Sequence, residues 1–104
     1  MKITGYRLEK FTQKMDRAIG DANFPAGDDL MGMAILWIDT DEGISGVAPT
    51  GNDAVASLFH VIEGKDPRGV VGLWKEMVDW VHKGNNEGEV NGAIAAIDVA
   101  LWDL

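Results

Sequence analysis

The sequence contains no cysteine, and this absence excludes several kinds of chemistry. Disulfide bonds, thiol catalysis, and zinc or iron–sulfur sites with cysteine ligands all need the missing residue. The two histidines, His60 and His82, fall in separate predicted helices, and neither has a second ligand at metal-binding spacing on its own face. We therefore predict that this chain holds no metal and no cofactor.

Basic residues and long apolar runs are also scarce. Nine lysines and arginines stand against 17 acidic residues, and the net charge of −8 disfavours contact with nucleic-acid phosphates. The longest apolar run, Leu30 to Ile38, is far short of the roughly 20 residues that span a bilayer. The N-terminus lacks the apolar core of a signal peptide. We expect a cytoplasmic protein that binds neither nucleic acid nor membrane.

The first half of the chain has strand-like patterns at Lys2–Lys14, Leu30–Thr40 and Ile44–Ala48. A short turn signal at residues 40–43 joins the second and third of these segments, and the three together predict a three-stranded antiparallel meander. The second of these strands is apolar on both faces, which predicts a central strand that is covered on both sides. The apolar residues of the first strand change face, so we expect a bulge near Glu9 or Lys10.

The second half has three helical patterns, so the fold class is α+β, with the meander followed by a helical bundle. The first helix opens at Asn52 or Asp53 and closes at Gly64, with an apolar stripe at Val55, Leu58, Phe59 and Ile62. The second opens with Asp66-Pro67 and ends at Gly84, with its stripe at Val70, Val71, Trp74, Met77, Val78 and Val81. The third runs from Val90 to Leu104 and is rich in alanine, which predicts close packing on several sides.

The connection from Met15 to Asp29 has no periodicity that favours a helix or a strand. Irregular segments of this length are uncommon inside small domains and often serve as lids or binding loops. Arg17 could bind a carboxylate ligand with two hydrogen bonds, Phe24 could form an apolar wall, and Asn23 lies beside Phe24. These three residues are our candidates for substrate contact. The alternative is a mobile surface loop with one buried phenylalanine.

Two acidic groupings invite a functional interpretation. Asp39, Asp41 and Glu42 bracket a turn but lack the further oxygen ligands of an EF-hand, so a solvated hairpin turn is favoured. Asp98 and Asp103 lie in an otherwise apolar helix, where an unpaired carboxylate is costly. Anchoring to backbone groups of a neighbouring domain is favoured over catalysis for this pair.

The third helix is apolar on most faces, and the sequence stops inside its pattern without a capping residue. We therefore expect a piece of a longer protein and an exposed apolar patch on this helix. Trp74, Trp80 and Trp102 are predicted to serve core or interdomain packing.

The residues from Ala93 to Leu104 read AIAAIDVALWDL. This run resembles the signature of the mandelate racemase and muconate lactonizing enzyme branch of the enolase superfamily. The order of elements and the segments Gly64-Lys65-Asp66-Pro67 and Leu73-Trp74 agree with it, so the resemblance covers nearly the whole chain.

The resemblance implies an N-terminal capping domain at residues 1–89, with 90–104 starting the helix that leads into a (β/α)₇β barrel. In that family the barrel holds magnesium and the groups that remove the proton α to a substrate carboxylate, and the first long loop of the cap helps to set substrate choice. It also implies a small carboxylic acid substrate, an acid-sugar dehydratase or a racemase as the parent, and a homo-oligomer. No catalytic residue can be assigned within this chain. The rival interpretation is a stand-alone α+β binding or interaction module without catalysis.

Overall fold

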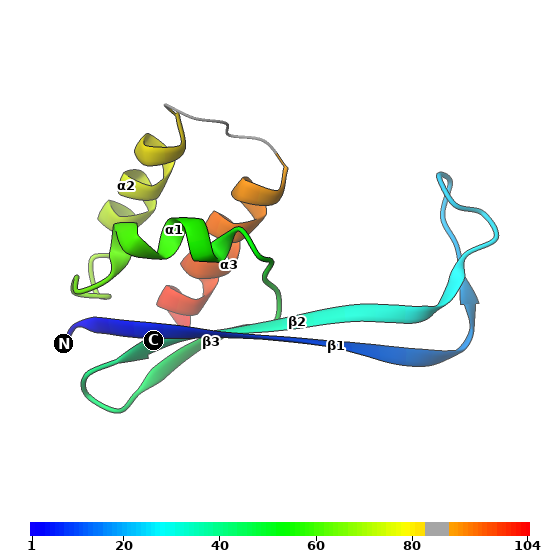
Figure 1. Cartoon of the computed structure of the whole chain (residues 1–104), viewed down its shortest axis with the longest axis horizontal. Helices are drawn as coiled ribbons and strands as arrows, with labels where there is room; N and C mark the ends of the chain where they lie inside the picture. The colour runs from blue at the N-terminus through cyan, green and yellow to red at the C-terminus, as the bar shows by residue number, and fades with distance from the viewer. Residues whose placement is uncertain (83–87) are drawn as a thin grey trace.

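The computed structural model describes residues 1–82 and 88–104, which form a three-stranded sheet followed by three helices. The elements are β1 (Ile3–Ile19), β2 (Asp28–Thr40), β3 (Ser45–Ala48), α1 (Val55–Ile62), α2 (Val70–His82) and α3 (Glu89–Asp103). The strands are antiparallel in the order β1-β2-β3, and the helices lie together on one face of the sheet (Figure 1). The predicted α+β class and meander are confirmed.

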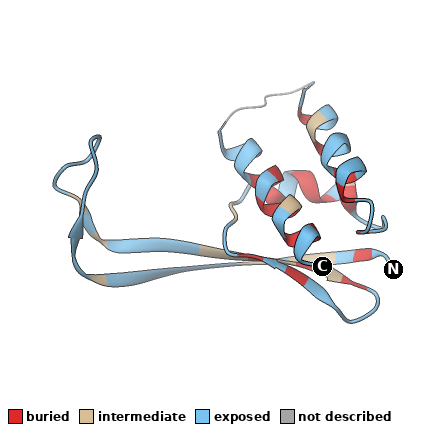
Figure 2. Ribbon diagram, turned by 180° about the vertical axis from the view of Figure 1, so that it is seen from behind, coloured by how far each residue is buried: buried red, intermediate tan, exposed pale blue. Residues whose placement is uncertain are grey.

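The hydrophobic core lies between the helices and one end of the sheet. Leu36 and Ile38 of β2 are fully buried there, and the inward faces of all three helices pack over them (Figure 2). The predicted stripe of α1 is buried in full, at Val55, Leu58, Phe59 and Ile62. The alternation of β2 and the helical periodicity of α1 therefore meet in a single core.

Helix α3 is held closely against β3 by small residues and one carboxylate. A methyl group at Gly46 would lie 1.9 Å from the carbonyl oxygen of Ala100, so only glycine allows this approach. The backbone N–H of Val47 donates to the Asp103 carboxylate at 2.9 Å. Close packing of the alanine-rich helix is confirmed. Asp103 anchors to backbone as predicted, although its partner lies in this chain.

The predicted irregular connection from Met15 to Asp29 is wrong in its extent. Strands β1 and β2 continue beyond the helices as a two-stranded arm, and the connection between them is reduced to residues 20–27 (Figure 1). Pairing runs to Lys14 and Leu30 and resumes at Ile19 and Asp28. The arm has no buried face, so its sequence lacks the alternation that identifies a half-buried strand.

Two further expectations for the sheet are wrong. The register of β1 with β2 is unbroken from Gly5 to Lys14, and the shifts fall at Ile3/Gly5 and Lys14/Ile19, not near Glu9 or Lys10. Within the described residues only one face of β2 is covered, because all three helices lie on the same side. The apolar residues of its other face, among them Met31 and Met33, are exposed.

The helix starts lie slightly later than predicted for α1 and α2. Asn52 accepts from the Ala54 N–H at 3.0 Å, and Asp66 accepts from the Arg68 N–H at 2.9 Å, so both form turns just before a helix instead of capping it. In α2 the buried positions are Val70, Leu73, Met77 and Val81, whereas Val71 and Trp74 of the predicted stripe are exposed.

The remaining helix ends agree with expectation where they are described. Gly64 ends α1 with φ +78°, and its N–H donates to the Ile3 carbonyl at 2.8 Å, which ties the helix to the start of β1. Helix α3 begins at Glu89, one residue before the predicted start. The predicted end of α2 at Gly84 lies outside the described residues. None of the described helices is long and apolar enough to cross a membrane.

The predicted hairpin turn after β2 carries a polar cluster on the face that the helices leave open. Arg7 donates two hydrogen bonds to the Asp39 carboxylate, at 2.9 and 3.1 Å, and its guanidinium lies 5.0 Å from the Trp37 ring centre. Ser45 donates to the same carboxylate at 2.6 Å. The hydrogen bonds from Arg7 first, and that from Ser45 second, lower the pKa of Asp39 below its ordinary value. Asp41 accepts from the Lys2 N–H at 2.8 Å.

Replacement of Gly46 by alanine should destabilise the fold by about 2–3 kcal/mol, because the new methyl group meets the rigid backbone of α3. Gly32 is the matched control, since it also lies in a strand and has open space around its Cβ position. Gly32→Ala should change the free energy of unfolding by less than about 1 kcal/mol. Urea denaturation of both variants measures the difference, and equal midpoints would contradict the close packing of α3.

Replacement of Arg7 by glutamine should raise the pKa of Asp39 toward its ordinary value of about 4. Because the folded-state pKa of Asp39 is depressed, its contribution to stability is present above that ordinary value and is lost as the pH falls through the folded pKa. Carboxyl NMR titration should show a larger rise for Arg7→Gln than for Ser45→Ala, since Arg7 is the leading cause. A larger rise for the serine variant would show that the ranking is wrong.

Candidate functional site

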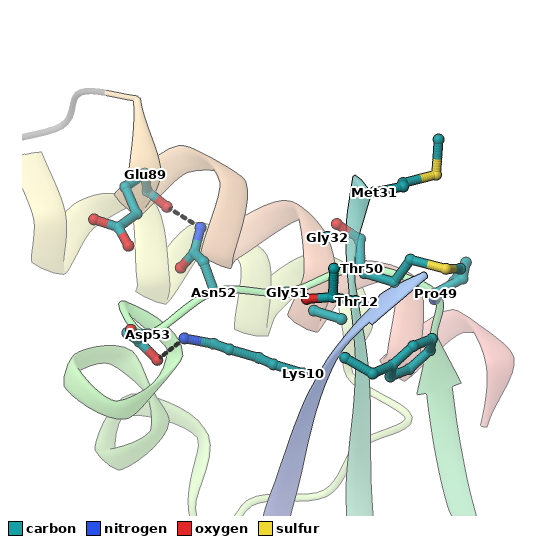
Figure 3. Close-up of a pocket in the computed structure, with 13 residues that line it drawn as sticks. Lys10, Thr12, Met31, Gly32, Pro49, Thr50, Gly51, Asn52, Asp53 and Glu89 are labelled. Atoms are coloured by element: carbon teal, nitrogen blue, oxygen red, sulfur yellow. Dashed lines mark hydrogen bonds and ion pairs between the residues drawn. The ribbon is translucent and has the colours of Figure 1, made fainter. Parts of the chain in front are cut away.

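A broad open hollow of about 690 Å³ lies on the helical side of the sheet, where the arm leaves the helices (Figure 3). Strands β1 and β2 form one wall, and the β3–α1 connection with the start of α3 forms the other. The lining residues are Lys10, Phe11, Thr12, Met31, Gly32, Met33, Ala34, Pro49, Thr50, Gly51, Asn52, Asp53 and Glu89. The hollow therefore combines residues from opposite ends of the sequence.

The β3–α1 wall of the hollow is fixed by Asn52. Its amide Nδ2 donates to the Glu89 carbonyl at 2.8 Å, and its Oδ1 accepts from the Ala54 N–H. Both ends of the side-chain amide are thus used, one to hold α3 and one to shape the turn before α1. This leaves the connection in a defined position opposite the arm.

The charged groups of the hollow are Lys10, Asp53 and Glu89. Lys10 crosses from β1 to pair with Asp53, and both side chains are largely exposed, so the pair adds little to stability (Figure 3). With one cation against two carboxylates, the hollow does not by itself form an anion site. The hollow offers the hydrogen-bonding groups of Asn52 and the charged residues, whereas Phe11 and Met33, which also border it, alternate to the opposite face of the sheet.

The predicted contact residues lie outside this hollow, in the outer part of the arm. Arg17 is exposed on β1, and Asn23 and Phe24 lie in the connection at the tip, where Phe24 is 56% exposed. Asn23 and Phe24 are consecutive residues of this connection. No hydrogen bond or ion pair among the described residues links Arg17 to either of them. Whether these residues contact a substrate stays a prediction.

The tip connection is ordered by Asp21, which was not among the predicted contact residues. The Asp21 carboxylate accepts from the backbone N–H groups of Asn23 and Phe24, at 2.9 and 2.8 Å. Gly27, with φ +70°, donates its N–H to the Phe24 carbonyl at 3.1 Å. An aspartate that accepts from the backbone two residues further on is a recognised turn signal, so this turn could have been found from sequence.

The remaining candidate residues take structural positions. His60 of α1 packs edge-on against the Trp80 ring at 4.9 Å between ring centres. Asp98 is half-buried on α3 and, unlike Asp103, contacts no backbone donor among the described residues. In the part of the chain that the structure describes, no three His, Asp or Glu residues gather in a group that could hold a metal ion.

Comparison with known proteins gives two curated relatives. A D-galactonate dehydratase family member of Marinomonas sp. strain MWYL1 is 36% identical over 84 residues, which are 69% of this chain. The D-galactonate dehydratase of Variovorax paradoxus strain S110 is 38% identical over 78 residues, or 66% of this chain. The matched regions span about a fifth of the length of either relative. No protein-family model matches the chain.

Solved structures share the fold over almost the whole chain. D-glucarate dehydratase of Agrobacterium tumefaciens, complexed with magnesium, has a TM-score of 0.81 at 24% identity and matches 100% of this chain and 29% of its own. L-talarate dehydratase of Polaromonas sp. JS666, complexed with magnesium and L-glucarate, has a TM-score of 0.78 at 22% identity and matches 99% and 31%. A mandelate racemase/muconate lactonizing enzyme-like protein of Rubrobacter xylanophilus has a TM-score of 0.79 at 21% identity and matches 98% and 29%.

At such identities the solved structures establish the fold alone, and the curated relatives add sequence identity above 35%. Both agree with the resemblance of residues 93–104 to the branch signature. The chain belongs to the enolase superfamily, in its mandelate racemase and muconate lactonizing enzyme branch, and it has the fold of the N-terminal domain.

Proposed function

We propose that this chain is the capping domain of a magnesium-dependent acid-sugar dehydratase or racemase, with residues 1–89 as the cap proper and 90–104 leading toward a barrel domain. The observation that carries the proposal is the similarity to a D-galactonate dehydratase family member, at 36% identity, and to a D-galactonate dehydratase, at 38% identity. Dehydration is favoured over racemisation because both of these curated relatives are named for dehydration. The substrate class is a small polyhydroxylated carboxylic acid.

The shape of the arm supports a capping role. Strands β1 and β2 extend well past the helices, and nothing in the described part of the chain covers either face of the arm (Figure 1). An uncovered ribbon with a well-ordered tip is suited to lie over a site formed by another part of the protein. Closure of such a lid excludes water and strengthens electrostatic interactions with the bound substrate.

The residues of the outer arm have the chemistry that an acid sugar requires. Arg17 is exposed and unpaired among the described residues, so its guanidinium is free to bind a carboxylate with two parallel hydrogen bonds. The Asn23 amide can donate to and accept from sugar hydroxyls, and Phe24 can cover the apolar face of the carbon chain. The three residues together would select for an anion that carries hydroxyl groups.

Magnesium is expected because solved neighbours contain it, and not because this chain offers ligands for it. Two of the solved neighbours are complexed with magnesium. The described residues offer no cluster of three ligands, so the metal would be held by the barrel domain of the proposed parent. Bound there, magnesium would stabilise the enediolate formed after removal of the α proton. The role of this chain is to close the site and contact the substrate.

The first test is activity of the longer polypeptide encoded by the reading frame that contains this chain. With magnesium it should dehydrate or racemise at least one acid sugar from a panel that includes D-galactonate, and a chelator should abolish turnover. The 104-residue chain alone should exchange no α proton in deuterated buffer. A longer polypeptide that binds acid sugars without turnover would instead support the binding module.

The second test addresses the tip of the arm. In the longer enzyme, Arg17→Ala should lower kcat/KM by about tenfold or more, as expected for one charge-assisted contact worth roughly 1.5–3 kcal/mol. Phe24→Ala should also lower kcat/KM, with an unchanged thermal melt. Lys75→Ala is the matched control, because Lys75 is an exposed cation on α2, far from the arm in sequence. Unchanged kinetics for Arg17→Ala and Phe24→Ala would make the arm tip an ordinary surface turn.

A further inference from the structure

The face of the sheet that the helices leave uncovered, called the open sheet face below, is apolar along its length (Figure 1). Its six apolar side chains come from all three strands and are Phe11, Met31, Met33, Ile35, Trp37 and Val47. Four of the six are 37–46% exposed, and none packs against the core beneath the helices. An antiparallel sheet with water on one side ordinarily places polar residues there, so this face calls for a covering layer.

The composition of the open sheet face is that of an interface and not of a solvated surface. Aromatic residues, methionine and arginine are enriched in interface cores, and this face has Phe11 and Trp37, two methionines, and Arg7 lying over the Trp37 ring. Although the chain has a net charge of −8, the only charged residues at the paired positions of this face are Arg7, Glu9 and Asp39. Arg7 and Asp39 already neutralise each other. Two acidic molecules can therefore meet here with little repulsion.

Arg7 and Glu9 give the open sheet face a self-complementary charge pattern. They lie at successive outward positions of β1. Nε and Nη2 of Arg7 donate to Asp39, which leaves Nη1 without a hydrogen bond in the part of the chain that the structure describes. Glu9 is exposed and makes no hydrogen bond or ion pair with any described residue. In a two-fold contact each Glu9 can accept from the free Nη1 of Arg7 in the other copy, so both groups gain a partner.

We propose that the open sheet face binds the same face of a second copy of this chain. In this contact β2 of one copy runs antiparallel to β2 of the other, with Ile35 of both copies next to the two-fold axis. Trp37 of each copy then meets Met33 of the other, which is a favourable contact between a ring and a thioether. The proposal goes beyond the proposed function, because it requires neither turnover nor a substrate.

The location of the face favours a second copy over the other possible occupants. Leu104 lies on the helical side of the sheet, where its side chain contacts the position above Gly46. A polypeptide that continued from Leu104 would therefore begin on the far side of the sheet. Anionic membranes and nucleic acids are disfavoured by the net charge of −8. An unrelated protein would not by necessity supply the reciprocal partners of Arg7 and Glu9, whereas a second copy does so by symmetry.

Cysteine cross-linking of the longer polypeptide tests the proposal, because residues 1–104 contain no cysteine of their own. Packed sheets lie about 10 Å apart, which is too far for a disulfide, so a short bismaleimide is the reagent. Ala34→Cys is the matched control for Ile35→Cys, since consecutive side chains of a strand point to opposite faces. The Ile35→Cys variant should give at least about five times the covalent dimer of the control, because a residue beside a two-fold axis faces its own copy. The polypeptide without either substitution reports any cross-link from cysteines beyond Leu104.

Substitutions on the two faces of the arm provide a second readout. Met33→Glu places a carboxylate in the apolar contact, and Glu9→Arg opposes Arg7 of the other copy. Each should remove the Ile35→Cys cross-link and lower the sedimentation coefficient. Leu30→Glu is the matched control for Met33→Glu, because Leu30 is exposed on the same strand but points to the helical side, and it should change neither result.

Three results would overturn the proposal. They are a monomeric longer polypeptide, an oligomer in which Ile35→Cys and Ala34→Cys cross-link equally, and an Ile35→Cys cross-link that survives Met33→Glu. An active acid-sugar enzyme with any of these results would reject the second-copy contact alone. A specific Ile35→Cys cross-link in a polypeptide without turnover would keep the contact and reject the proposed activity.

Discussion

The close contact between α3 and β3 determines which surfaces of the domain are buried and which remain open. Gly46 lets the backbone of α3 approach the strand, and Asp103 accepts the Val47 N–H at the end of the same helix. With α3 seated there, α1 and α2 complete a layer over one end of one sheet face. The rest of the sheet is left without cover from the described residues.

Three open surfaces follow from this arrangement, and each has its own chemistry. The arm carries an exposed arginine and an ordered tip, the hollow beside it is bordered by Asn52 and the Lys10–Asp53 pair, and α2 and α3 leave Trp74 and Trp102 exposed. The hollow lies on the same side of the sheet as the helices, where the arm begins. The small core and the exposed apolar surface support the proposal that this domain works as one part of a larger protein.

Sequence alone predicted the elements that bury a regular face. The stripe of α1 and the alanines of α3 were identified because burial imposes helical periodicity and small residues at close contacts. It failed for the arm, since a ribbon without a buried face need not alternate. It also failed for Val71 and Trp74, which are exposed although they are large and apolar and continue the helical stripe.

The candidate site was predictable only in part, because its residues come together through tertiary structure. Asn52 was identified as a capping residue, yet its amide also bridges to the Glu89 carbonyl of a helix far away in the sequence. Lys10 lies on the same sheet face as Tyr6 and Leu8, but beyond the point where the helices cover the strands. The sequence does not show where along the strand this cover ends. The pairing of Lys10 with Asp53 was therefore hidden.

The central claim is that this domain closes over a substrate bound by the larger enzyme. Hydrogen exchange of the longer polypeptide, with and without a non-reacting acid-sugar analogue and magnesium, measures this closure directly. The account predicts that the analogue slows exchange at residues 20–27 of the arm tip and at 49–53 beside the hollow, while α2 is unaffected. Unchanged exchange at the arm tip, with saturating analogue bound, would contradict it.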